Sequence, residues 1–233
     1  MPKSSSTVSL SPCYNDNETL EIGIDEAGRG PLFGRVYTAA VVLPKSETFD
    51  HSLMKDSKKF HSAKKINEAA EYIKKNALFW KVAWSDEDTV DKINIRQATF
   101  RAMHDAIREI VSKSGTSDLL LLVDGNDFKT YSMFDESTQC QVCVPHLCFE
   151  GGDNKYSAIA AASILAKTSR DQYIEDLCKT HPALDTLYGI GSHKGYGTKK
   201  HLEAIRDHGV TPWHRKSFGI CKSAKLNNGF GEK

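Results

Sequence analysis

Five segments have the hydrophobic pattern of β-strands. Residues Leu20–Asp25 alternate apolar and other side chains, which is the period of a half-buried strand. Residues 118–123 read DLLLLV, a continuous apolar run that is typical of a strand covered on both faces. The remaining predicted strands are rich in β-branched and aromatic residues and span residues 35–43, 78–84 and 141–149.

Four segments show helical spacing between these strands. Residues 63–76 and 94–114 place their apolar side chains on one face, and Gly115 provides a stop for the second of these helices. Residues 157–178 begin with AIAAASILA, which is apolar all round and predicts a buried helix, and a shorter helix is predicted at 199–208. Strands interleaved with helices predict an α/β fold, a five-stranded sheet with helices packed on it.

Composition is compatible with one globular body. The chain has 233 residues, of which 39% are hydrophobic and 26% charged, and it contains neither a membrane-length apolar run nor a secretory signal pattern, so a cytoplasmic location is predicted. Six cysteines are scattered along the chain and are interpreted as reduced thiols. Cys140 and Cys143 form a C-x-x-C pair; without a second pair a zinc site is disfavoured, and buried thiols are expected.

Charge is concentrated near the C-terminus. The net charge is +1, but residues 193–225 hold eight Lys and Arg against two acidic residues, which leaves the rest of the chain at −5. A basic end on an acidic protein favours a polyanionic partner such as nucleic acid, although an ordinary solvated basic helix has the same pattern.

Four acidic residues stand where apolar strands end. Asp25 and Glu26 close the first strand, Asp124 closes the most apolar one, and Asp153 lies in a Gly-Gly-Asp-Asn turn before the buried helix. Carboxylates near a core are costly unless they are paired or bind a metal, and their oxygens suit hard cations such as Mg²⁺ or Mn²⁺. Two such ions can activate water against a phosphodiester. Turn formation and capping are the alternative role for each acid taken alone.

The glycine-rich segment Gly28–Gly34 is not a dinucleotide site. Its spacing is G-x-G-x-x-x-G, and a strand follows it where a pyrophosphate site needs a helix. The P-loop pattern and the G-x-S-x-G nucleophile motif are both absent from the sequence.

Taken together, these segments resemble one known family. GIDEAGRGP at residues 23–31 looks like the signature opening of the ribonuclease HII family, the type 2 ribonucleases H. Later segments match the family in the same order: DSKK at 56–59, NI at 94–95, VDGN at 123–126, AASILAK at 161–167, RD at 170–171, HKGYGT at 193–198 and HRKSF at 214–218. The resemblance extends from about residue 20 to 220.

The resemblance implies a ribonuclease H-like mixed five-stranded sheet flanked by helices, with a helical basic C-terminal extension. The polar, Ser-rich composition of residues 1–18 predicts a disordered tail. The expected parts after it are a catalytic core at 19–180, the extension at 181–222 and a flexible tail at 223–233. The short segment before the first strand favours type HII over HIII, which carries an extra N-terminal domain. The implied activity is hydrolysis of RNA in RNA–DNA hybrids and nicking 5′ of ribonucleotides embedded in DNA, which leaves 3′-hydroxyl and 5′-phosphate ends.

Individual residues take implied roles from the same motifs. The family's metal-binding acids correspond to Asp25, Glu26, Asp124 and Asp153, which would hold two Mg²⁺ or Mn²⁺ ions, whereas Asp171 is interpreted as structural. The substrate-binding set comprises the ribose-sensing Gly28, Arg29 and Gly30, the phosphate-contacting Ser57 and Lys58, and Tyr196, which would stack on the deoxyribose at an RNA–DNA junction.

Other functions remain open on the residues alone. A different nuclease on the same fold would share the acids without needing the 2′-hydroxyl, and a non-catalytic binder would have lost an acid. A monomer is the default expectation. A replication clamp is a further possible partner, although the tail KSAKLNNGFGEK has no clear clamp-binding motif.

Overall fold

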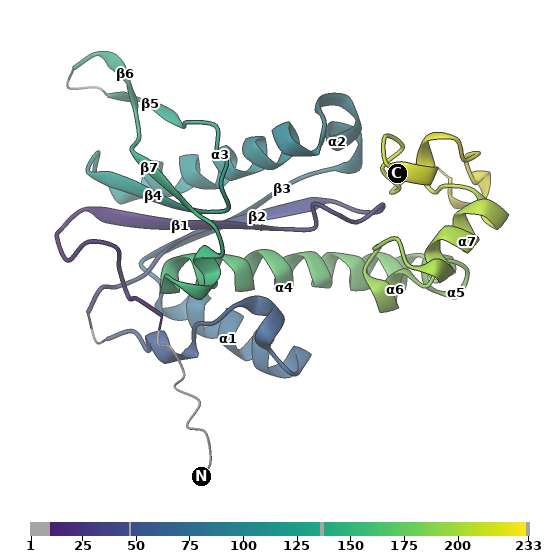
Figure 1. Ribbon diagram of the computed structural model, residues 1–233, viewed down its shortest axis with the longest axis horizontal. Helices are drawn as coiled ribbons and strands as arrows, with labels where there is room; N and C mark the ends of the chain where they lie inside the picture. Colours follow the sequence, from purple (N-terminus) through teal and green to yellow (C-terminus); the bar gives the residue numbers. More distant parts are fainter. Residues whose placement is uncertain (1–9, 47, 136–137, 232–233) are drawn as a thin grey trace, which may run out of the picture. The chain divides into compact units, whose positions relative to one another are not determined.

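The computed structural model describes residues 10–46, 48–135 and 138–231 and contains a mixed five-stranded sheet flanked by helices (Figure 1). The strand order is β3-β2-β1-β4-β7, and β1 pairs in parallel with β4, as β4 does with β7. The predicted fold class is thereby confirmed. The strands are β1 (Leu20–Ala27), β2 (Val36–Val42), β3 (Phe79–Ser85), β4 (Leu119–Asp124) and β7 (His146–Phe149).

The predicted helices are present with small shifts in their ends. The α-helices are α1 (Ala63–Asn76), α2 (Glu87–Ile93), α3 (Ile95–Ser114), α4 (Ser157–Thr180), α5 (Ala183–Thr186), α6 (Ile190–His193) and α7 (Lys199–His208). The hydrophobic pattern did not predict α2, α5 or α6. Asp86 caps α2 by accepting from the Thr89 amide. Asn94, predicted to begin a helix, caps the start of α3 by accepting from the Gln97 amide, and it also ends α2 with φ at 65°. This left-handed residue separates α2 from α3.

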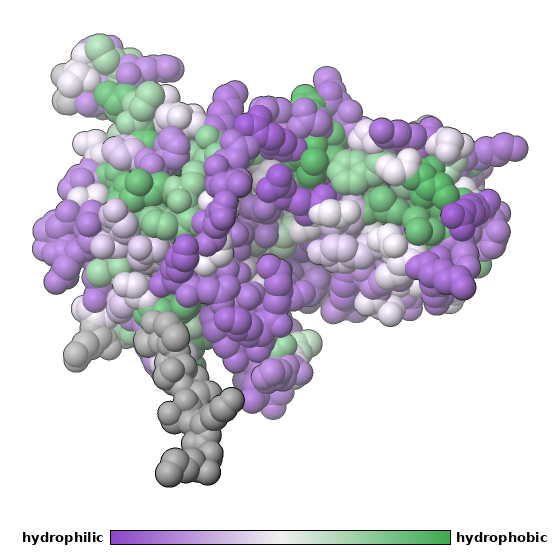
Figure 2. Space-filling model, in the orientation of Figure 1, coloured by the Kyte–Doolittle hydropathy of each residue, from purple (hydrophilic) through white to green (hydrophobic). Residues whose placement is uncertain are grey.

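The predicted strand at 141–149 is wrong as a single element. Its first part belongs to β6 (Cys140–Cys143), which pairs antiparallel with β5 (Ser132–Asp135), and only β7 joins the main sheet. Pro145 lies between β6 and β7, and its lack of an amide N–H ends the strand ladder there. Cys140 and Cys143 are exposed free thiols, so the expectation of buried thiols is also wrong. The hairpin projects beyond β7 (Figure 1) and carries apolar surface, seen at upper left in Figure 2.

The chain folds into two compact units, each assembled from three separate segments. The first contains residues 1–25, 40–81 and 109–164. Its core includes fully buried side chains from β1, β4 and the start of α4, among them Ile22, Leu121 and Ile159. A Cβ atom placed on Gly23 would lie 2.2 Å from the Ala158 carbonyl carbon. Only glycine therefore allows α4 to begin against β1.

The second unit contains residues 26–39, 82–108 and 165–233. One of its apolar clusters joins Phe33 and Ile174 to Tyr188 and Trp213. Arg215 is buried in the same unit with no exposed surface. Residues 181–222 contribute α5, α6, α7 and a 3₁₀ turn at Gly219–Lys222.

The two segments predicted as tails make specific contacts where they are described. Residues 1–9 and 232–233 lie outside the described part of the chain. Ser11 bridges to Tyr156, and the amides of Tyr14 and Asn15 donate to the Glu21 carboxylate. At the other end, Leu226 bridges to Val210. Residues 10–18 and 223–231 therefore contact other residues of their own units. No helix of the described residues is long and apolar enough to cross a membrane.

Candidate metal centre and substrate loops

Asp25 and Asp124 lie at the ends of neighbouring parallel strands. The register pairs Ile24 with Val123, so the two aspartates that follow are opposite one another. Neighbouring strands are about 4.8 Å apart, and paired residues of parallel strands direct their side chains to the same face. Asp25 is 5% exposed, so its carboxylate belongs to the interior edge of the sheet. Strand pairing thus brings two of the predicted acids together.

Asp153 joins these acids through the segment that connects β7 to α4. It occupies a 3₁₀ turn at Gly152–Asn154, which directly precedes α4, and it is 4% exposed. The Gly152 amide donates to Asp124 Oδ1 at 2.7 Å, which ties the turn to the end of β4. Because α4 begins against Gly23, the turn is also anchored close to the end of β1. Asp25, Asp124 and Asp153 all belong to the first unit.

The surroundings of Asp153 disfavour its negative charge. Burial raises the pKa of its carboxyl, and the charges of Asp56 and Asp124 raise it further. The charge of Lys58 and a 2.9 Å hydrogen bond from Asn154 oppose this shift only in part. A buried carboxylate repelled by other carboxylates is stabilised by a cation, so this corner of the fold has the electrostatic character of a divalent-ion site.

The turn at residues 56–59 adjoins the same site. Asn154 donates to Asp56 Oδ2 at 3.4 Å and accepts from Lys59. Burial alone would raise the pKa of the Asp56 carboxyl, but donation from the Lys58 amide, from Asn154 and the nearby lysine charges hold it below its ordinary value. Asn154, to which sequence analysis assigned no role, therefore links this turn to Asp153.

The predicted phosphate contacts differ in their accessibility. Ser57 is 5% exposed, and its hydroxyl lies 3.0 Å from the Ser163 hydroxyl. Its side chain thus anchors the turn within the protein. Lys58 is exposed on the same turn and is available to a phosphate.

The oxygen donors of Asp25, Asp124 and Asp153 fit a hard divalent cation by their chemistry. Across the described residues, no three His, Cys, Asp or Glu side chains are already grouped as ion ligands. The fourth predicted acid, Glu26, belongs to the second unit, and its carboxylate pairs with Arg29 at 3.1 Å. Asp171 pairs with Lys167 at 2.8 Å within α4, in line with a structural role.

The Gly28–Gly30 loop is shaped by the second unit. Gly28 has φ at +90°, and a Cβ there would lie 2.1 Å from Arg170 Nε, so glycine is required. Arg29 and Gly30 are exposed. Tyr196 is 51% exposed, and one of its ring carbons lies 3.7 Å from where a Gly30 Cβ would stand. The two predicted substrate loops therefore border a common surface.

The basic C-terminal stretch is less available to a polyanion than its charge count indicates. Arg215 is fully buried, and Lys194 pairs with Glu175 at 3.0 Å. The remaining six cations are exposed: Lys199, Lys200, Arg206, Lys216, Lys222 and Lys225.

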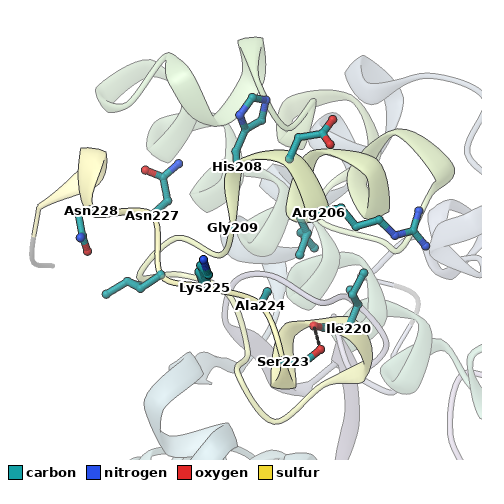
Figure 3. Close-up of a pocket in the computed structure, with 12 residues that line it drawn as sticks. Arg206, His208, Gly209, Ile220, Ser223, Ala224, Lys225, Asn227 and Asn228 are labelled. Carbon is teal, nitrogen blue, oxygen red and sulfur yellow. Dashed lines mark hydrogen bonds between the residues drawn. The ribbon is translucent and has the colours of Figure 1, made fainter.

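A cavity of about 690 Å³ lies between the end of α7 and the C-terminal segment. None of the predicted site residues lines it. Figure 3 shows the Arg206 and His208 side chains of its wall pointing in different directions, so they do not form a converging anion site. The cavity is not a candidate active site.

Comparison with solved structures places the chain in the ribonuclease H-like class of folds. Ribonuclease H2 from Pyrococcus horikoshii OT3 aligns with TM-score 0.65 and 20% identity over 87% of this chain and 95% of that one. RNase HII from Archaeoglobus fulgidus, solved as a PCNA complex, aligns with TM-score 0.62 and 23% identity over 86% and 96%. Bst-RNase HIII in complex with Mn²⁺ aligns with TM-score 0.56 and 14% identity over 85% and 70%.

Sequence comparison then defines the family. The model of the Ribonuclease HII family matches residues 22–221. Ribonuclease HII of Bacteroides thetaiotaomicron is 42% identical over 93% of this chain and 98% of its own length, and that of Bacteroides fragilis is 43% identical over 93% and 97%. The chain belongs to the ribonuclease HII family, whose enzymes cleave RNA in RNA–DNA hybrids and depend on divalent metal ions.

Proposed function

We propose that this ribonuclease H also nicks duplex DNA 5′ of an embedded ribonucleotide, with two Mg²⁺ or Mn²⁺ ions held by Asp25, Glu26, Asp124 and Asp153. The observation that carries the proposal is the register of β1 and β4, which sets Asp25 opposite Asp124, together with the Gly152 amide that ties Asp153 to Asp124. Glu26 enters the set as the residue bonded directly to Asp25 and by its match to the family motif.

The protein's own contribution to the reaction is positioning and charge. Bound ions would supply an activated water and stabilise the leaving 3′ oxygen, which gives 3′-hydroxyl and 5′-phosphate ends. Asp124 is held by the Gly152 amide, and Asp153 by Asn154, so their oxygens are oriented before an ion binds. Lys58 projects beside Asp153 and supplies positive charge for the substrate backbone.

Selection of a ribonucleotide is assigned to the second unit. Gly28, Arg29 and Gly30 offer backbone groups to the 2′-hydroxyl, which is displayed in the shallow minor groove of the duplex. Tyr196 would stack on the following deoxyribose. The 3.7 Å approach between the Gly30 position and the Tyr196 ring supports reading of adjacent sugars. Ser57 would act through its anchored turn and not through its buried hydroxyl.

A replication clamp remains a proposed partner. RNase HII of Archaeoglobus fulgidus was solved with PCNA, but that likeness is limited to the fold, and the C-terminal sequence of this chain has no clear docking motif. Monomeric state and cytoplasmic location stay predictions.

Three matched duplexes test the proposal directly. They carry zero, one or several consecutive ribonucleotides in one strand and are incubated with Mg²⁺ or Mn²⁺. We expect cleavage of the second and third duplexes only, 5′ of a ribonucleotide, and loss of cleavage in Asp124→Asn. Cutting of the all-DNA duplex would favour a nuclease that ignores the 2′-hydroxyl, and an intact single-ribonucleotide duplex would refute the nicking activity.

A further inference from the structure

The loop that carries Tyr196 is held from beneath by buried histidines. His201 and His214 have no exposed surface, and their Nε2 atoms lie 3.0 Å apart. Nδ1 of His201 lies 2.9 Å from the Tyr196 carbonyl oxygen. On the far side, the Thr211 amide donates to Nδ1 of His214 at 2.9 Å. A continuous chain of hydrogen bonds therefore connects Thr211 to the Tyr196 backbone.

The direction of this chain follows from its ends. The Thr211 amide can only donate, so Nδ1 of His214 accepts and the proton of the neutral ring is on Nε2. That proton is donated to Nε2 of His201, which places the His201 proton on Nδ1, facing the Tyr196 carbonyl. Burial lowers the pKa of both rings, so both are neutral at pH 7. A third ring, His193, stacks on His201 with centroids 4.7 Å apart and accepts from the Gly195 amide.

Arg215, which follows His214 in the sequence, holds the Gly28–Gly30 loop through hydrogen bonds to its backbone. Its guanidinium donates to the carbonyl oxygens of Gly28 at 2.6 Å, of Arg29 at 2.9 Å and of Pro31 at 2.8 Å, and Nε donates to Gly34 at 2.9 Å. A fully buried guanidinium directed at four backbone carbonyls fixes the path of a loop and leaves no donor pair for a phosphate.

Backbone contacts join the two loops at this point. Phe33 and His214 form an antiparallel bridge, and the Arg215 amide donates to the Leu32 carbonyl at 2.8 Å. The Leu32 amide in turn donates to the Gly195 carbonyl, next to Tyr196, at 2.9 Å. Two consecutive residues, His214 and Arg215, thus reach both loops. Every contact in this arrangement lies within the second unit.

We propose that His214 and Arg215 are positioning residues that fix the separation between Gly30 and the Tyr196 ring, and so set the preference for a ribonucleotide followed by a deoxyribonucleotide. The proposal rests on the proposed function of these loops. Both residues act through others: His214 through His201 on the Tyr196 carbonyl, and Arg215 on the carbonyls of the glycine loop. Neither touches the substrate.

Two substitutions of His201 separate a positioning role from a packing role. Asn places its amide nitrogen where Nδ1 stands and keeps the side-chain donor to the Tyr196 carbonyl. Gln reaches His214 instead and leaves that carbonyl with the Thr198 amide as its remaining donor. Both substitutions replace the buried ring of His201 with a smaller side chain. The measured quantity is the ratio of kcat/KM for a duplex with one ribonucleotide to kcat/KM for a uniform RNA–DNA hybrid. We expect His201→Gln to lower this ratio about five- to tenfold, the value of one hydrogen bond, and His201→Asn to retain it.

The reference variants keep the proposal distinct from the proposed function. Tyr196→Ala should lower the same ratio. His208→Gln should leave it unchanged, because His208 is exposed on α7, the helix that also carries His201. If Tyr196→Ala has no effect on the ratio, the junction-reading role of Tyr196 is wrong and the positioning proposal is overturned with it. If Tyr196→Ala lowers the ratio while His201→Gln leaves it at the wild-type value, or lowers it no more than His201→Asn, only the positioning proposal is overturned.

Two further measurements extend the test to the wild type and to Arg215. Nitrogen-15 NMR of the wild type should find the Nδ1–H tautomer at His201 and the Nε2–H tautomer at His214. The reverse assignment would overturn the proposed chain of hydrogen bonds, and this result does not depend on whether the variants fold. Arg215→Lys keeps a charge but not the planar fork, so kcat/KM should fall about tenfold or more on both substrates, and more on the single-ribonucleotide duplex, which lowers the ratio. Unchanged kcat/KM on both would overturn the role of Arg215.

Discussion

Substitution of Gly23 by alanine tests how the acids are brought together. The added Cβ would lie 2.2 Å from the Ala158 carbonyl carbon, 2.4 Å from its oxygen and 2.5 Å from the Ile159 nitrogen. Ordinary contacts of this kind begin near 3.4 Å, so either β1 or the first turn of α4 must move by about 1 Å. The obstructing atoms are backbone, and no side-chain rotation can relieve them.

The expected loss of stability is about 1–3 kcal/mol, the range for inserting a methyl group into a packed interior. For a chain of this length that corresponds to a fall in Tm of roughly 2–12 °C. The effect on activity should be larger than the effect on folding. Asp25 follows Gly23 by two residues and Asp153 precedes α4, so the same shift separates the two carboxylates, and a misplacement of about 1 Å can cost about 100-fold in rate.

The assay combines thermal melting with single-turnover cleavage of a ribonucleotide-containing duplex at a temperature where both proteins are folded. Gly197→Ala is a suitable control for the melting temperature because a Cβ there meets nothing closer than 3.5 Å. A Gly23→Ala protein that melts with the wild type and cleaves at the wild-type rate would refute the reasoning that this contact positions the site.

Two further predictions concern the titration of the buried histidines His201 and His214 and the role of Asp171. Burial, with a smaller contribution from repulsion by His193, lowers the pKa of His201 to about 4. Burial, with repulsion by His201, lowers the pKa of His214 to about 3. Below pH 6.5 the two rings take up protons in the unfolded chain but not in the folded protein. Their contribution to the free energy of unfolding is therefore complete above pH 6.5. It decreases by about 1.4 kcal/mol per pH unit for each ring as the pH falls toward 4. Denaturation curves between pH 7 and 4.5 should show this slope in the free energy of unfolding. A steeper decrease in His214→Asn than in the wild type would contradict the prediction. Asp171→Asn should retain cleavage because its carboxylate pairs with Lys167, and a loss like that of Asp124→Asn in the same cleavage assay would assign Asp171 to the site.

The sequence was sufficient for the elements with a clear period. An apolar run predicts β4 and an amphipathic pattern predicts α1, and the position of Asp124 follows from the end of the apolar run. It failed where one residue overrides a pattern. Pro145 divides what looked like a single strand, and the left-handed Asn94 ends α2, a helix that the hydrophobic pattern did not predict.

The sequence predicted the candidate metal ligands, but not the buried residues that hold the surrounding loops in place. Acids at strand ends identify candidate ligands because their position is set by local sequence. The burial of Ser57 and Arg215 depends on partners 106 and 181 residues distant, Ser163 and Gly34, which no local pattern encodes. Arginine is rarely fully buried, so its charge was counted with the solvent-exposed basic stretch. The motif around Arg215 was visible, but its role required the fold.

Calorimetric titration of Mn²⁺ into the protein without substrate tests the central claim most directly. Binding should be measurable in the wild type and at least tenfold weaker in both Asp124→Asn and Asp153→Asn, because each removes a charged oxygen ligand without changing side-chain size. Asp171→Asn should bind as the wild type does. Equal Mn²⁺ affinity in the wild type and in the Asp124 and Asp153 variants would contradict the assignment of these acids to a metal centre.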